Sequence, residues 1–275
     1  MRDRLRQLSL NTATTGHQWP LARLAQACAH VGLGGIAPWR RDLAGLPPAA
    51  ARRAFAEAGL ACTSLCRGSF LTHADKAQRQ AILDDNRRAI DEAHELGAPS
   101  LCMVVGGLSP GSKSLPYARA QVREMLGLLL EHARPAGVRL AIEPLHPMYA
   151  ADRSCVSTLA SALDLADAIG REVGVVVDAY HVWWDPDLER QLHRAGPDRI
   201  LSYQVCDWLV PTRDLLLDRG MMGDGAIDLK SLGRMVEAAG YRGPVEVEIF
   251  SAERWWKTDP LQTIRTCAER FLACC

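Results

Sequence analysis

Acidic side chains stand near the ends of four apolar runs in the second half of the chain. The runs RLAIEP, VGVVVD, ILSYQVCD and PVEVEIF carry, in order, Glu143, Asp178, Gln204 with Asp207, and Glu246 with Glu248. Carboxylates are rarely buried unless they are paired or bound to a metal. Several carboxylates brought together repel one another and resist ionising, and a divalent cation removes that cost. The pattern therefore predicts a metal site with oxygen ligands, which suit Mn2+ or Mg2+, with Co2+ or Zn2+ as alternatives.

The last of these runs carries two glutamates, Glu246 and Glu248. Side chains alternate along a strand, so both point to the same face. We take Glu248, nearer the carboxyl end, as the metal ligand. Glu246 is expected just outside the ligands, either deeper in the fold or paired with a basic group.

Short apolar runs alternate with amphipathic segments along the whole chain. The runs predict strands at Leu8–Thr12, Gly35–Trp39, Cys62–Cys66, Ser100–Val105, Arg139–Pro144, Val173–Asp178, Ile200–Cys206 and Val245–Phe250. Apolar residues at three- and four-residue spacing predict helices at Pro20–Val31, Pro48–Ala58, Lys76–Leu96, Tyr117–Ala136, Val156–Ile169, Leu188–Ala195, Leu229–Ala239 and Asp259–Leu272. Five of these helical segments are followed by a glycine just before the next strand, which is a common way to end a helix.

Eight repeats of strand and helix predict an α/β fold, a (β/α)8 TIM barrel that forms a single domain over residues 1–275. A doubly wound open sheet is the alternative. That fold more often has a glycine-rich turn after its first strand, and LSLNTATTGHQW has none. In a barrel, the carboxyl ends of all strands meet at one mouth, which is where active sites lie.

The composition limits the kinds of partner. The 275 residues include 32 Lys and Arg and 32 Asp and Glu, so the formal net charge is zero, which disfavours nucleic acid as a partner. No apolar run is long enough to span a bilayer, and MRDRLRQLSL is unlike a signal peptide. The 9 cysteines, several inside apolar runs, predict reduced thiols. We expect a cytoplasmic protein with a small-molecule substrate and leave homo-oligomerisation open.

Longer segments around the acids resemble a known family. LAIEPLHP, VVVDAYHVWWDP, QVCDW, DRGMMGDGAIDL and GYRGPVEVEIFS are similar to the xylose-isomerase-like TIM barrel family of sugar phosphate isomerases and epimerases. The family includes ketose 3-epimerases, inosose isomerases and dehydratases, and DNA repair enzymes of the endonuclease IV type. The resemblance covers nearly the whole chain. It implies one divalent metal ion held by Glu143, Asp178, Gln204 and Glu248. Family members usually have His where this chain has Gln204, and an amide oxygen is a weaker ligand than imidazole.

The resemblance also implies roles in catalysis. Glu143 and Glu248 would pass a proton to and from opposite faces of the substrate, next to a metal-polarised carbonyl, through an enediolate. Some family epimerases have a further glutamate where this chain has Tyr149. His181 and Arg219 are implied as substrate contacts, and Asp207 is expected just outside the ligands. We add three further candidates for substrate contact: His146 in EPLHP, Arg67 after the third strand, and Trp39 at the end of the second.

These features favour a metal-dependent enzyme that isomerises or epimerises a small sugar, ketose or cyclitol. A lyase that dehydrates a keto-cyclitol or keto-sugar is the first alternative; it would begin with the same proton abstraction and then use a general acid such as His181. A nuclease acting on abasic DNA would need more histidine ligands and a basic face. A metal-free binding subunit is the fourth reading, because Gln204 replaces the usual histidine.

Overall fold

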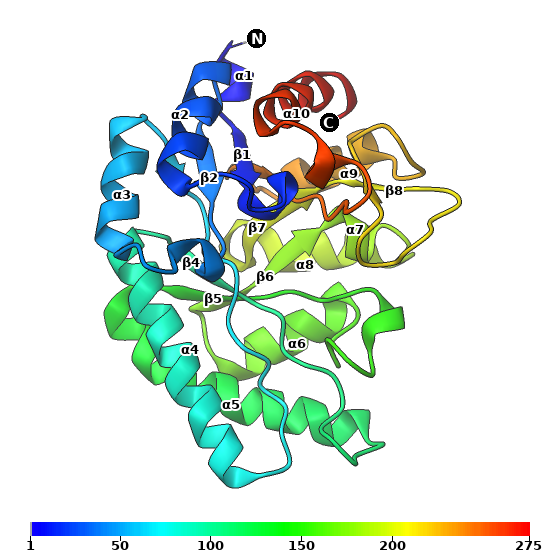
Figure 1. Ribbon diagram of the computed structural model, residues 1–275. Helices are drawn as coiled ribbons and strands as arrows, with labels where there is room; N and C mark the ends of the chain where they lie inside the picture. The colour runs from blue at the N-terminus through cyan, green and yellow to red at the C-terminus, as the bar shows by residue number, and fades with distance from the viewer. Residues whose placement is uncertain (1) are drawn as a thin grey trace.

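The computed structural model describes residues 2–275, and its strands form the inner layer of the molecule (Figure 1). Eight of them make one sheet: β1 Leu8–Asn11, β2 Gly35–Ala37, β3 Ala61–Cys62, β4 Ser100–Met103, β5 Arg139–Ile142, β6 Val173–Asp178, β7 Ile200–Val205 and β10 Val245–Val247. A separate two-stranded pair consists of β8 Asp207–Trp208 and β9 Arg219–Gly220.

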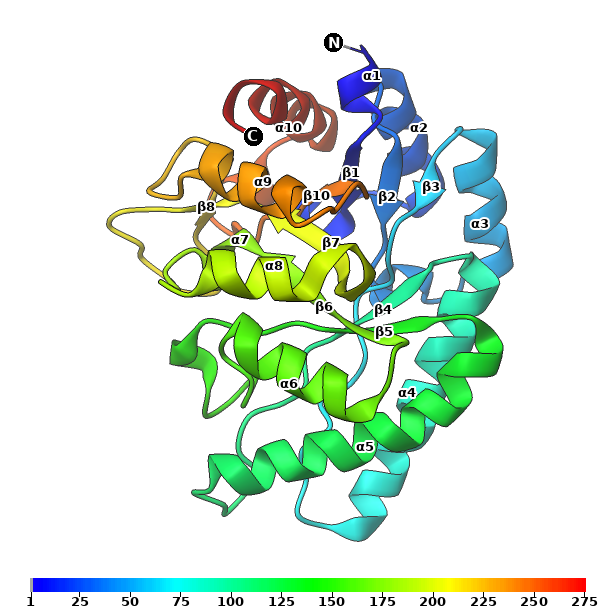
Figure 2. The ribbon, with the colours of Figure 1, turned by 180° about the vertical axis from the view of Figure 1, so that it is seen from behind.

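Helices surround this sheet on its outer side, as the two opposite views show (Figures 1 and 2). The main ones are α2 Leu21–Val31, α3 Pro48–Glu57, α4 Lys76–Leu96, α5 Leu115–Ala136, α6 Leu159–Ile169, α8 Leu188–Arg199, α9 Leu229–Ala238 and α10 Pro260–Cys274. Shorter elements are α1 Arg2–Leu5, α7 Ala179–Val182 and the 3-10 turns η1 Thr12–Thr15, η2 Arg40–Leu43, η3 Pro147–Tyr149 and η4 Trp255–Lys257.

The sheet runs in the order β3-β2-β1-β10-β7-β6-β5-β4, and all of its neighbouring strands are parallel. Its two ends meet through a parallel bridge between Leu65, which follows β3, and Leu101 in β4. The Leu65 N–H donates to Ser100 O, and the Cys102 N–H donates to Leu65 O, both at 3.0 Å. The prediction of a (β/α)8 barrel is therefore confirmed.

The core divides into two layers because the strands are buried on both faces. The larger layer packs between strands and helices and includes Leu8, Leu10, Ile36 and Phe55. A smaller cluster fills the barrel itself: Cys66, Cys102, Val104, Ala141, Leu145, Tyr149 and Val176. No helix within residues 2–275 is both long enough and apolar enough to cross a membrane.

Most predicted boundaries are close to the observed ones, and those of β6 and α4 agree fully. The predicted strand Cys62–Cys66 is too long, because β3 ends at Cys62 and the chain beyond it makes only single bridges at Leu65 and Cys66. The predicted helix ending at Ala195 continues to Arg199 only across a kink, where Gly196 takes a φ of 58°. The pair β8–β9 and the short helix α7 were not predicted.

Candidate active site

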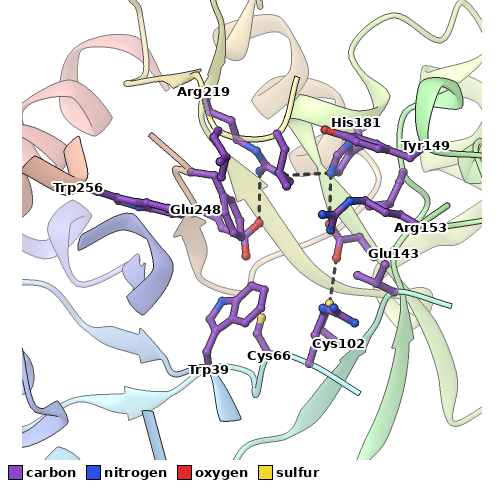
Figure 3. A pocket seen from close by; sticks show the side chains of 16 residues that line it. Trp39, Cys66, Cys102, Glu143, Tyr149, Arg153, His181, Arg219, Glu248 and Trp256 are labelled. Atoms are coloured by element: carbon purple, nitrogen blue, oxygen red, sulfur yellow. Dashed lines mark hydrogen bonds and ion pairs between the residues drawn. The ribbon is translucent and has the colours of Figure 1, made fainter. Parts of the chain in front are cut away.

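A cavity of about 200 Å³ opens at the carboxyl ends of the strands (Figure 3). Its wall includes Trp39, Cys66, Arg67, Cys102, Glu143, Tyr149, Arg153, His181, Arg219, Glu248, Phe250 and Trp256. These residues come from loops and strand ends all round the barrel. The cavity therefore lies at the mouth, where the sequence predicts the site.

Three of the predicted acids meet around this cavity. Glu143 follows β5, Asp178 ends β6 and Glu248 follows β10, and all three are buried. Nη1 of Arg219 donates to Asp178 Oδ2 at 3.1 Å and to Glu248 Oε2 at 3.3 Å. Nε2 of His181 lies 3.6 Å from Asp178 Oδ2 and 3.8 Å from Glu143 Oε1. The carboxylates thus share one arginine and one histidine in a space that little water enters.

Burial makes these acids hard to ionise. It raises the pKa of Glu143 to about 7, and the charge of Asp178 adds to the rise, although Cys102, Arg219 and Arg67 oppose it. Burial also raises the pKa of Asp178 and, more strongly, that of Glu248, against the opposing charge of Arg219. A single guanidinium does not fully offset the loss of water, so an additional cation would stabilise the charged acids.

Gln204 lies beside these acids with its amide oriented by a neighbour. The strand register pairs Gln204 with Asp178 on one side and with Glu246 on the other. Its Nε2 donates to Glu246 Oε1 at 2.9 Å, and an ionised carboxylate only accepts, so the NH2 group must face Glu246. Its Oε1 is buried and has no hydrogen-bond partner within residues 2–275. A buried carbonyl oxygen without a partner is costly, so this atom has free capacity for a ligand.

Glu246 lies beside Gln204 on the neighbouring strand β10 and accepts its amide hydrogen bond. Its carboxylate also accepts from Asn11 Nδ2 at 2.7 Å and from Ser64 Oγ at 3.0 Å. The alternative that Glu246 pairs with a basic group is wrong, because all three of its donors are neutral. Neutral donors satisfy the carboxylate without adding charge to the site.

The donor set fits a divalent cation. Glu143, Asp178 and Glu248 supply carboxylate oxygens, and Gln204 supplies the unpartnered amide oxygen. An all-oxygen set of this kind suits hard cations such as Mg2+ or Mn2+. Within residues 2–275, the possible ligand atoms of two groups lie within 4.8 Å of one another inside each group, one from Glu143, Asp178 and His181 and the other from Cys66, Glu246 and Glu248. The three carboxylate donors therefore come from both groups, and His181 offers a nitrogen beside Glu143 and Asp178.

His181 is placed by α7 and by the backbone of the neighbouring loop. Its Nδ1 accepts from the His146 N–H at 3.2 Å. Burial holds the pKa of His181 well below its usual value, and the charge of Arg219 lowers it further. The imidazole is therefore neutral near pH 7, which suits hydrogen bonding to a ligand better than proton donation.

The remaining predicted residues fall into two groups. Trp39 and Arg67 line the cavity, and Trp39 Nε1 donates to Asn11 Oδ1 at 2.8 Å. His146 does not line it; its ring packs 5.5 Å from that of Trp184 and 5.2 Å from that of Trp208. The His146 backbone N–H donates to His181, and a substrate contact of the His146 ring stays a prediction.

Asp207 contacts the segment that carries and follows Arg219, rather than the buried acids. Its carboxylate accepts from the N–H groups of Gly223 at 2.9 Å and Ile227 at 3.0 Å. The same residue begins β8, which pairs antiparallel with β9 and so holds Arg219. Its role in the structure is to fix the loop that carries the arginine.

Several residues of the site were not predicted. Asn11 Nδ2 also donates to Glu248 Oε1 at 2.9 Å, and Cys102 Sγ donates to Glu143 Oε2 at 3.1 Å. Asn11 ends β1, so the rule that selected acids at strand ends would have found it had it been applied to amides. Tyr149 and Arg153 come from the loop after β5; the resemblance marked position 149 only as the place of a glutamate in some family members, and nothing marked Arg153.

Comparison with known proteins places the chain among its relatives. Residues 25–267 match the family model described as xylose isomerase-like TIM barrel. The chain belongs to this family. Protein SMc04130 from Sinorhizobium meliloti has a solved structure that is 53% identical, with a TM-score of 0.95 over 98% of this chain and 99% of that one. The solved IolI protein with a bound zinc atom is 22% identical, with a TM-score of 0.82 over 97% and 96%, and this likeness is one of fold.

The relatives with named activities include isomerases and a dehydratase. An inosose isomerase of Bacillus velezensis is 32% identical over 154 residues, which are 53% of this chain and 51% of that protein. The match thus spans about half of that relative. A 3-dehydroshikimate dehydratase of Pseudomonas putida is 28% identical over 252 residues, which are 87% of this chain and 37% of that protein.

Proposed function

We propose that this chain is a divalent-metal-dependent isomerase or epimerase of a small sugar, ketose or cyclitol. The observation that carries the proposal is the buried group of Glu143, Asp178 and Glu248 beside the unpartnered Oε1 of Gln204. The named isomerase relative and the family support the same class of reaction. The metal would be Mn2+ or Mg2+, given four oxygen donors, with Co2+ or Zn2+ as alternatives.

The residues that would hold the ion are Glu143, Asp178, Gln204 and Glu248. Once bound, a divalent ion polarises a substrate carbonyl and makes the proton on the adjacent carbon more acidic. Arg219 already neutralises part of the charge of Asp178 and Glu248 and so keeps both carboxylates in place. Its guanidinium is also positioned to hold an oxygen of the substrate by a charge-assisted hydrogen bond.

Proton transfer is assigned to the two glutamates. Glu143 lines the cavity just after β5, so its carboxylate can take up a proton from a substrate bound there and later release it. Glu248 enters from β10, across the cavity from Glu143 on β5 (Figure 3). One carboxylate removes the proton from a carbon next to the carbonyl, and the other returns it on the opposite face or at the neighbouring carbon. The enediolate between these steps is the intermediate of the proposed reaction.

The cavity wall excludes water on the side away from the acids. Trp39, Phe250 and Trp256 line it, with Leu216 and Leu217 from the loop between β8 and β9. That loop is fastened because the hydroxyls of Tyr149 and Tyr180 both donate to Leu215 O, at 2.6 and 2.8 Å. An apolar wall of this kind suits the carbon face of a sugar or cyclitol ring and protects an enediolate from solvent.

A lyase is the second candidate, because the dehydratase relative matches 87% of the chain. Dehydration would start with the same proton abstraction and would then need a group that protonates the departing hydroxyl. His181 suits that part less well than the sequence alone indicates, because its pKa is held well below the usual value. Glu143 fits it better, because it carries a proton once it has taken one from the substrate carbon and it lines the cavity.

The test is to measure bound metal and proton exchange together. Protein purified without chelators or a metal-binding tag is analysed for metals by mass spectrometry, beside Glu248→Gln and, as a matched control, the exposed Glu131→Gln. We expect near-stoichiometric metal in the native protein and in the control, and a sharp loss in Glu248→Gln. Incubation of the native protein with keto-cyclitols and ketoses in D2O should then place deuterium on carbon, without loss of mass for an isomerase and with loss of water for a lyase. Native protein that takes up no Mn2+ or Mg2+ when either is added would refute the proposal.

A further inference from the structure

Two arginines of the cavity have no acidic partner. Arg67 and Arg153 both line it and are both half-buried, yet neither takes part in an ion pair with any residue of 2–275. The contrast with Arg40, nearby at the rim, is clear, since that side chain is held by Asp85 at 3.0 Å and Glu92 at 2.7 Å. A guanidinium that loses water without gaining a carboxylate is unusual unless a ligand completes it.

Each of the two is held by an aromatic ring. The guanidinium of Arg67 lies 4.5 Å from the centre of the Phe70 ring, and its Nη1 donates to Gly68 O at 3.1 Å. That of Arg153 lies 5.8 Å from the centre of the Tyr149 ring, and its side chain makes no hydrogen bond with the described residues. A guanidinium has five N–H donors, so most donors on both residues are free.

The two arginines line the same cavity, and their charges act on each other. Burial lowers the pKa of Arg67, and the charge of Arg153 lowers it further, although Glu143 and the Cys102 thiol act in the opposite direction. Figure 3 shows the Arg153 side chain reaching into the cavity from the side of Tyr149 and Glu143. Its loop is fixed there because the Gly106 N–H donates to Arg153 O at 2.9 Å.

A count of the charges in the site indicates what the two arginines bind. The count includes a bound divalent ion and so rests on the proposed function. Glu143, Asp178, Glu246 and Glu248, if all are ionised, carry four negative charges. Arg219 and one divalent ion together carry three positive charges. Arg67 and Arg153 add two more, so the loaded site would have one positive charge in excess. A neutral substrate leaves that excess uncompensated, and an anionic substrate removes it.

We propose that Arg67 and Arg153 form a subsite for an anionic group of the substrate, a carboxylate or a phosphate. The substrate is then a keto-sugar or keto-cyclitol that carries negative charge, and its carbonyl lies at the acids while its anionic group lies at the arginines. Guanidinium groups bind both oxyanions through paired N–H donors, which also fixes the orientation of the ligand. A neutral inosose lacks the group that this subsite binds.

Binding of simple probes tests the subsite. Protein loaded with Mn2+, its metal content confirmed by mass spectrometry, is titrated in a calorimeter with inorganic phosphate, with cyclohexanecarboxylate, and with the uncharged cyclohexanecarboxamide. The variants are Arg67→Met, Arg153→Met and the double variant. Arg265→Met, which removes an exposed positive charge on α10, is the matched control. Circular dichroism and thermal unfolding confirm that each variant folds, and Arg153→Lys provides a conservative substitution.

We expect at least one of the two anions to bind at least tenfold more tightly than the carboxamide. Each single Arg→Met change should weaken that anion about tenfold or more, with partial recovery in Arg153→Lys and no change in Arg265→Met. Preference for phosphate would indicate a phosphorylated substrate, and preference for the carboxylate would indicate a sugar or cyclitol acid. The subsite is refuted if neither anion binds the metal-loaded protein better than the carboxamide, or if the arginine variants bind the anion as the native protein does. Failure to take up Mn2+ would instead refute the proposed function.

Discussion

The two halves of the barrel mouth contribute opposite kinds of group to the site. The later strands, β5, β6 and β10, end in buried carboxylates, namely Glu143, Asp178, Glu246 and Glu248. The earlier half ends in neutral donors, namely Asn11, Ser64 and Cys102. Four neutral hydrogen bonds cross between the halves from these donors to the acids: Asn11 donates to Glu246 and Glu248, Ser64 to Glu246 and Cys102 to Glu143.

This division shows how the fold tolerates so many acids in one place. Neutral N–H, O–H and S–H groups stabilise a carboxylate without adding a positive charge that would displace a metal ion or bind the substrate unproductively. The only cation in direct contact with these acids among residues 2–275 is Arg219, which is carried by the separate β8–β9 pair. The later half should therefore carry the chemistry, and the earlier half should position it.

The strongest test of whether the later half carries the chemistry is to remove one of its acids. Glu143→Gln keeps the size of the side chain but removes the proton-transfer group. We expect deuterium incorporation into substrate to fall by about 10²- to 10⁴-fold, which is the usual cost of losing a general base. Proton exchange is followed by NMR in D2O, with the exposed Glu131→Gln as control. A loss smaller than about tenfold would remove Glu143 from the reaction.

The fold could be predicted well because its buried strands are apolar runs in the sequence. The acids of the site could be predicted because they interrupt or end such runs. An acid at the end of a buried strand such as β6 is conspicuous, so Glu143, Asp178 and Glu248 were found by residue type alone. Asn11 and Cys102 are ordinary residues of buried strands and Ser64 lies just beyond β3, so nothing distinguished them. Their role depends on which strands lie side by side, and the pairing of β1 with β10 joins residues about 235 positions apart.

The loop residues were harder to predict for a different reason. Arg153 and Tyr149 lie at the cavity only because their loop bonds to the loop after β4 through Gly106. The ring of His146 packs on those of Trp184 and Trp208, which the sequence pattern did not indicate. Periodicity carries no information on such contacts, because they depend on the path of the loop and not on a regular element.

A smaller effect is expected where the two halves meet at Gln204 and Glu246. If Glu246 fixes the amide so that Oε1 faces the metal, Glu246→Leu should weaken Mn2+ binding about 10- to 100-fold, as loss of a group that orients a ligand usually does. Gln204→Leu should cost a similar factor, and the double variant should cost little more than either single one. Glu246→Gln keeps an acceptor for Gln204 Nε2 and should stay close to native.

Calorimetric titration with Mn2+ gives the four affinities, with circular dichroism to confirm folding. Independent, multiplicative losses in the two leucine variants would mean that Glu246 does not act through Gln204. A large loss in Glu246→Gln would mean that its negative charge, rather than its hydrogen bond, is what the metal site needs.

The smallest expected effect concerns Asp85, an acid outside the mouth. Its pKa is lowered, whereas that of Glu143 is raised. Asp85 on α4 contacts Arg40 at 3.0 Å, and this arginine, with Ser69 and Arg88, lowers the pKa of Asp85 to about 2. Because its pKa is lower in the folded than in the unfolded protein, where it is about 3.9, the pair stabilises the fold above about pH 4. That contribution is lost as the pH falls through about 2.

The side chain of Asp85 is 29% exposed, so we reduce the full value of the shift for solvent screening and expect about 1 kcal/mol. Urea unfolding at pH 6 and at stepwise lower pH, for native protein and Asp85→Asn, measures it as the difference between the two curves. The difference should fall steadily below pH 4 and approach zero only below pH 2, where both side chains are uncharged. A difference that stays constant with pH would show that Asp85 stabilises the fold through its shape and hydrogen bonds alone. The contrast between Asp85, whose pKa is lowered, and Glu143, whose pKa is raised by burial, would then not extend to the stability of the fold.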